Sequence, residues 1–164
     1  MEDAQHALAT IEGALVLGFH LDGASASFEL VYDYWDKRPE ASRALAQLRF
    51  ESVQHFERVP GARADFRHVD DHYVSRDVPG ACEIEVLRTR VRPGHTELQA
   101  SLGSAFGGFE FRYQQVALEV VHLTSREAGD SVWSHRELDT GRPIDFHNPF
   151  SRPWAEPAFY PVAP

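Results

Sequence analysis

The chain has 164 residues but a single cysteine, Cys82, and a single lysine, Lys37. One cysteine cannot form an internal disulfide, and it excludes the paired-cysteine motifs of redox and zinc sites. No apolar run of about 18 residues or more occurs, so we expect no transmembrane helix. The segment 1–12 is acidic and lacks a basic stretch ahead of an apolar run, which is not the pattern of a secretory signal. These absences together predict a cytoplasmic protein.

Positive charge is also scarce, with 16 Lys and Arg residues against 25 Asp and Glu and a formal net charge of −9. Proteins that bind nucleic acid usually carry the opposite sign, because neutralising phosphates supplies much of their affinity. The composition therefore argues against a DNA or RNA partner. It is compatible with a basic protein partner, since opposite fields steer association.

Alternation of apolar and polar residues is the main positive signal. Residues 15–21 and 28–34 each place every second side chain on one side, and Asp22-Gly23 between them is typical of a β-hairpin turn. The alternation resumes in the second half of the chain. There it covers the segments 82–91, 96–102 and 109–123, and it predicts Cys82, Ile84 and Val86 on a core side. We therefore predict a mainly β protein, an antiparallel β-sandwich or a jelly roll, with residues 1–142 as a single β domain.

One segment fits two structures. Its apolar residues recur at helical spacing, which predicts a helix at about 40–58 and an α+β fold. The same segment also fits a strand, on which Ala46, Leu48 and Phe50 share one face. A short pattern (an aromatic residue, two polar residues, then valine) begins at Phe50 and again at Tyr113. Two copies of one pattern favour two similar strands, so we expect the strand.

Residues 143–164 combine six prolines with five aromatic residues. Proline at this density excludes helix and central strand, so we expect an extended tail. Five exposed large aromatic side chains would favour aggregation, and we therefore expect the tail to dock on the body, over a sheet edge or an open core. The alternative is a proline-rich ligand for a partner's groove.

The stretch FRHVDDHY, residues 66–73, raises the question of a metal site. On a strand, His68 and Asp70 would point to the same face. Such a pair with a distant histidine is the ligand set of a facial-triad Fe(II) enzyme of the jelly-roll type, or of a Zn(II) site. The third ligand would be His135, with His122 and His147 as alternatives. A chain with nine histidines also produces this spacing by chance, and the flanking residues indicate a solvated loop.

The stretch LDTG, residues 138–141, copies the aspartic-protease signature. That chemistry needs two aspartates that share a proton, and the chain has no second copy. Arg142 follows directly and would pair with the carboxylate, so we interpret the stretch as a turn. The signatures of P-loop, dinucleotide-binding and serine-hydrolase sites are also missing.

The stretch YDYWDKR, residues 32–38, is typical of a protein-binding surface. Trp35 would act as the aromatic anchor, with Asp33 and Asp36 as charged groups that set specificity. The other interpretation places the two tyrosines of this stretch in the core and leaves both aspartates merely exposed. The candidate partner-binding residues are Asp33, Trp35, Asp36, Asp70, Asp71 and Tyr73.

The hairpin leading into YDYW, the stretch LRFESVQHF and the later FGGFEFRYQQVAL resemble small bacterial β-sandwich proteins, some of them assigned as immunity proteins of toxin systems. The resemblance covers residues 14–122. It implies an acidic domain that blocks a basic toxin, often a nuclease, and it implies no catalytic residue and no cofactor. We therefore expect a non-enzymatic protein-binding domain. The alternatives are a small jelly-roll metalloenzyme and a structural or assembly subunit.

Overall fold

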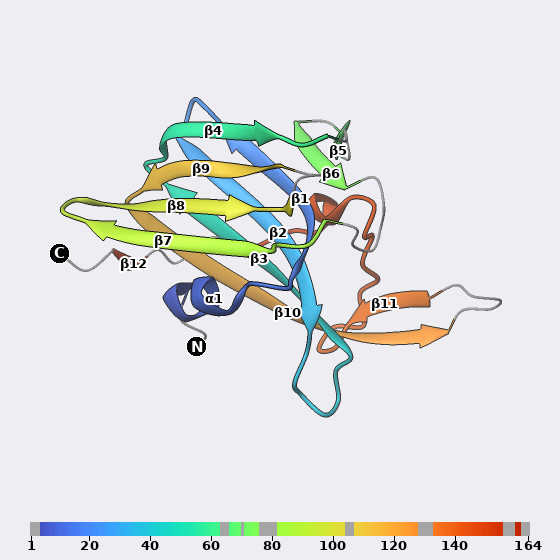
Figure 1. Ribbon diagram of the computed structural model, residues 1–164. Helices are drawn as coiled ribbons and strands as arrows, with labels where there is room; N and C mark the ends of the chain where they lie inside the picture. The colour runs from blue at the N-terminus through green and yellow to red at the C-terminus, as the bar shows by residue number, and fades with distance from the viewer. Residues whose placement is uncertain are drawn as a thin grey trace.

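The computed structural model describes residues 4–62, 66–69, 71–75, 82–103, 107–127, 133–155 and 160–161. The fold is mainly β. Two antiparallel sheets face each other as a β-sandwich, with one short helix at the N-terminal end (Figure 1). The predicted fold class is confirmed. None of the helices in the described part of the chain is long and apolar enough to cross a bilayer.

The larger sheet has the strand order β11 (Trp133–Glu137), β10 (Gln115–Glu127), β3 (Arg43–Glu51), β2 (Ser27–Trp35), β1 (Leu15–Asp22), β6 (His72–Ser75) and β5 (Phe66–Val69). A two-residue strand, β12 (Tyr160–Pro161), pairs with β10. The smaller sheet has the order β4 (Gln54–Pro60), β9 (Gly107–Tyr113), β8 (His95–Ser101) and β7 (Val86–Arg92). Helix α1 (Ala4–Thr10) and the 3-10 helix η1 (Pro149–Ser151) complete the described elements.

Aromatic side chains fill the core between the sheets. Phe28 and Phe50 of the larger sheet meet Phe111 of the smaller one, with ring centroids 5.1 Å and 5.0 Å apart. These residues occupy the alternate positions that face inward, as the period of two requires. Cys82 and Ile84 are fully buried in the same core, as predicted.

The segment that fitted two structures forms strands. The alternative prediction of a helix at about 40–58 was wrong, because this segment contains β3 and β4, which belong to different sheets. Ser52 and His55, at the crossing, both have positive φ, of 55° and 52°. Two left-handed residues let the chain turn out of one sheet and into the other, where a single bulged strand would have stayed in one sheet.

Three further expectations need correction. Val86 lies on β7, the edge strand of the smaller sheet, and it is exposed, because the next residue, Leu87, is the one that packs against the core. The loop expected around residues 66–73 is instead the β5–β6 hairpin, which extends the larger sheet beyond β1. The tail is not extended throughout, since η1 begins at Pro149, and proline is tolerated in the first turn of a helix.

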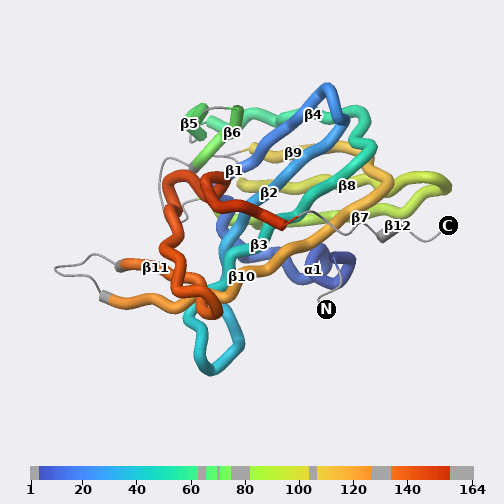
Figure 2. The backbone as a smooth tube through the Cα atoms, turned by 180° about the vertical axis from the view of Figure 1, so that it is seen from behind, coloured from blue at the N-terminus to red at the C-terminus, as the bar shows by residue number. Residues whose placement is uncertain are grey.

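The outer face of the larger sheet is buried as well. Figure 2 shows the segment that follows β11 crossing this face from behind. Phe146 of that segment joins Val31, Leu45 and Val121 in a second apolar cluster, and Trp154 packs against it. Phe146 and Trp154 therefore cover a sheet face, which had not been expected, while the tail strand β12 pairs with an edge of β10, as predicted.

Candidate functional site

A pocket of about 720 Å³ lies where α1 meets the end of β2 and the middle of β10; we call it the strand-end pocket, after the end of β2. Its walls include His6 from α1, Tyr34 and Trp35 from β2, and His122 from β10. Lys37 and other residues of the loop after β2 form part of the rim. This volume lies within the usual range for small-ligand sites.

The pocket exists because the inward-facing rows of the larger sheet run past the end of the smaller one. In the cross-strand register, Tyr34 of β2 lies opposite Ala44 of β3, and Ala44 lies opposite His122 of β10. Ala44 in the middle of this row is fully buried, and the tyrosine and the histidine on either side of it line the pocket. Helix α1 closes the space, with Leu8 buried in the main core.

His122 is held by a buried carboxylate. Its Nδ1 hydrogen-bonds to Oδ2 of Asp36, whose side chain is only 5% exposed. Oδ1 of Asp36 accepts the backbone N–H of Arg38 at 2.9 Å. Because an ionised carboxylate only accepts, Nδ1 carries the hydrogen and the neutral ring keeps a lone pair on Nε2. Among the described residues, Asp36 is the one hydrogen-bond partner of this imidazole.

Trp35 leaves the strand on the opposite side. It has the highest exposed fraction of the large hydrophobic side chains in the described part of the chain, 77%. The guanidinium of its cross-strand neighbour Arg43 lies 5.5 Å from the ring centroid. This cation–π contact holds the indole at the strand end while leaving most of it accessible.

The two aspartates of YDYWDKR are largely buried, so the expectation that they are exposed was wrong. Asp33 is fully buried on the outer face of the larger sheet, with Oδ2 2.6 Å from Nη2 of Arg43. Burial raises the pKa of Asp33 to about 6, although the charge of Arg43 acts in the other direction. Asp36 is enclosed beside His122. Of the three candidates in this stretch, only Trp35 is open to a partner.

The remaining partner-binding candidates lie at the other end of the larger sheet, on and beside the β5–β6 hairpin. The ring of Tyr73 stacks on Phe19 at 4.9 Å and is partly exposed. The backbone carbonyl of Asp71 hydrogen-bonds to Nδ1 of His20 at 2.6 Å. Asp70 lies outside the described residues. The five described candidates therefore do not form one surface.

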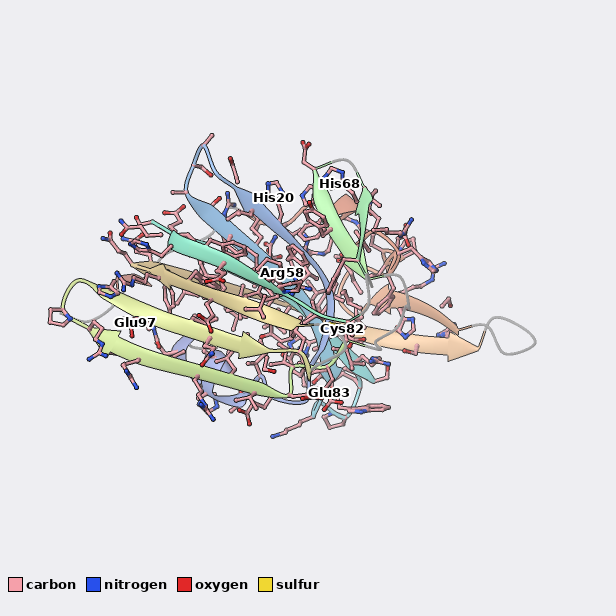
Figure 3. All side chains as sticks on the ribbon, turned by 45° about the horizontal axis from the view of Figure 1, so that its top comes forward. His20, Arg58, His68, Cys82, Glu83 and Glu97 are labelled. Atoms are coloured by element: carbon pink, nitrogen blue, oxygen red, sulfur yellow. The ribbon has the colours of Figure 1, made fainter. Side chains whose placement is uncertain are left out.

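The structure does not assemble the predicted metal site. His68 is on β5 and His135 on β11, the two ends of the strand order in the larger sheet. Figure 3 shows His68 near His20, beside the β5–β6 hairpin. His122 is engaged by Asp36, and His147 contributes a backbone carbonyl to Arg67. In the described part of the chain, no group of three His, Cys, Asp or Glu side chains could hold a metal ion.

The LDTG stretch forms a turn after β11. Thr140 Oγ1 donates to Glu137 Oε2 at 2.7 Å, and Gly141 adopts a φ of 69°. Both features satisfy local backbone and side-chain groups, as turn residues do.

The chain matches no protein-family model, no curated protein and no solved structure. The resemblance to bacterial immunity proteins therefore stays a prediction.

Sequence reasoning missed the pair of His122 and Asp36. The two residues are 86 positions apart, and only the pairing of β10 with β3 and of β3 with β2 brings them together. One signal was available. His122 continues the alternating row of Val116, Leu118 and Val120, so it could have been placed on the inward face of that strand.

Proposed function

We propose that the protein is a non-catalytic domain that binds a partner protein through Trp35. The observation that carries the proposal is the 77% exposure of this side chain at the end of a central strand. Tryptophan is among the residues most enriched at the energetic centres of protein interfaces.

The position of Trp35 also supports an interface. Trp35 is the last residue of β2. Its indole contacts the guanidinium of Arg43, which forms an ion pair with the buried Asp33. A side chain that is already ordered loses little conformational freedom when a partner binds. The strand end therefore offers a pre-organised anchor.

The net charge favours a basic partner. A formal charge of −9 gives an attractive field for a cationic protein and raises its association rate at low salt. The specific form that we propose is an immunity-type inhibitor of a basic bacterial toxin. The alternative, a structural subunit, would associate with copies of itself.

Native mass spectrometry of the protein isolated from its own host tests the proposal. We expect a heterocomplex with a basic protein, and Trp35→Ala should weaken it at least about tenfold. The matched control is Val91→Ala, which removes another exposed hydrophobic side chain from β7 of the other sheet and should bind normally. Equal binding by both variants, or only homo-oligomers, would overturn the proposal.

A further inference from the structure

We propose that the strand-end pocket is a second binding site, for a small phenolic ligand whose hydroxyl donates to Nε2 of His122. The site takes its aromatic wall from the inward side of β2 and its acceptor from β10, and Trp35 borders it at the strand end. The proposal does not depend on a protein partner. It rests on the shape of the pocket, its aromatic wall and one oriented acceptor.

The aromatic wall fits a flat ring. Tyr32 and Tyr34 both line the pocket, and their rings lie 5.8 Å apart at 32°. Tyr34 lies near the end of β2, beside helix α1, and the pocket runs along its ring toward His6 and Ala7 of that helix. A planar ring in the pocket can stack on this aromatic face, which adds to the area that it buries.

The acceptor is prepared in advance. Asp36 is nearly enclosed and accepts the hydrogen of Nδ1 of His122, so in the neutral ring Nε2 is left as a hydrogen-bond acceptor. The side chain of His122 keeps an exposed fraction of 22%, and it lines the pocket. A polar acceptor placed at the end of an apolar wall selects a ligand with an O–H at the matching position.

The charges at the rim select among phenols. Lys37 lines the pocket and makes no ion pair with a described residue, whereas Arg38 is paired with Glu40 at 2.9 Å. The carboxylate of Glu12, also at the rim, accepts the backbone N–H of Leu87. The free ammonium group therefore favours a phenol with an acidic substituent over a cationic one.

Isothermal titration of the full chain with 4-hydroxybenzoate and with benzoate tests the site. We expect saturable binding of 4-hydroxybenzoate in the millimolar range or tighter, and about tenfold weaker binding of benzoate, which lacks the hydroxyl. His122→Leu should reduce the affinity for 4-hydroxybenzoate about tenfold and leave benzoate unchanged. The control His68→Leu, on the exposed β5 strand, should bind both compounds like the wild type.

Two further measurements keep the test decisive. Ala7→Leu, on the wall that α1 supplies, should fill part of the pocket and weaken both compounds together. If His122→Leu does not fold, ¹⁵N spectra of the wild-type protein replace it. Addition of 4-hydroxybenzoate, and not of benzoate, should then shift the Nε2 resonance of His122. Absence of millimolar binding, or equal affinity for the two compounds, would overturn the proposal.

Discussion

Replacing Asp33 by asparagine should change how stability depends on pH. The Asp33 carboxyl is fully buried on the outer face of the larger sheet, beside the guanidinium of Arg43. Burial disfavours the charged form and raises the pKa from its usual 3.8 to about 6, against the attraction of Arg43. The folded chain therefore holds this proton more tightly than the unfolded chain does.

The sign and size of the effect follow from this difference. The contribution of Asp33 to the free energy of unfolding is fully present below about pH 4, and it is lost as the pH rises through about 6. The interval between 3.8 and about 6, at about 1.4 kcal/mol per pH unit, corresponds to about 3 kcal/mol. Asparagine does not ionise, so the variant escapes this loss, although its Arg43 no longer has a carboxylate partner.

Urea unfolding of the wild type and of Asp33→Asn, followed by circular dichroism from about pH 4 to about pH 7.5, measures the effect. We expect the free energy of unfolding of the variant, relative to wild type, to rise by about 2 to 3 kcal/mol across this range. A flat difference, or one that falls with pH, would refute the reasoning from burial.

Glu137→Gln supplies a control of opposite sign. Burial raises the pKa of Glu137, but hydrogen bonds from Thr140 and Arg152 and the charge of Arg152 together hold it below the usual range. This carboxyl stabilises the folded state above its unfolded pKa, and the contribution is lost as the pH falls. The relative stability of Glu137→Gln should therefore fall as the pH rises.

Three other predictions concern the tail, a tight turn and the thiol. Arg152→Leu removes the guanidinium that Glu119 and Glu137 of the larger sheet share. It should lower the free energy of unfolding by about 3 kcal/mol in urea titrations. Gly107→Ala, at a φ of 76° and with its new Cβ 1.9 Å from the carbonyl oxygen of Val59, should lower the thermal midpoint far more than Gly94→Ala, which has a φ of 82° but nothing within 4 Å. Cys82 is fully buried, so it should react with a thiol reagent only after unfolding; fast reaction of the native protein would contradict its place in the core.

Local chemistry made the first hairpin predictable. The alternation of residues 15–21 and 28–34 sets which side chains face the core, and the Asp22 carboxylate accepts the backbone N–H of Ala24 at 2.9 Å inside the turn. Both signals act within a few residues of each other. The same holds for the burial of Cys82, which followed from alternation alone.

The sequence did not predict the elements whose conformation depends on contacts between residues far apart in the chain. The step from β3 to β4 depends on positive φ at Ser52 and His55, and neither is glycine. Nothing in the local pattern marks these residues as left-handed, because their conformation follows from the two sheets that they connect. The seven residues of α1 were also missed, since their stability comes from packing Ala4 and Leu8 into the core.

The candidate site shows the same division. Alternation could place Asp33 on the face opposite Tyr32 and Tyr34, but its burial depends on what covers that face, and residues near 146 and 154 supply much of the cover. Both faces of the central strands are thus buried, one by the second sheet and one by the tail. Among the hydrophobic side chains of β2, Trp35 is the exposed one, because the strand ends there beyond both the second sheet and the tail. The two aspartates beside Trp35 contact other residues of the protein. Asp33 forms an ion pair with Arg43, whose guanidinium lies over the indole, and Asp36 orients His122. A partner that binds at the end of β2 would therefore contact the indole of Trp35 directly. The two aspartates would affect its binding only indirectly, through the positions of Arg43 and His122.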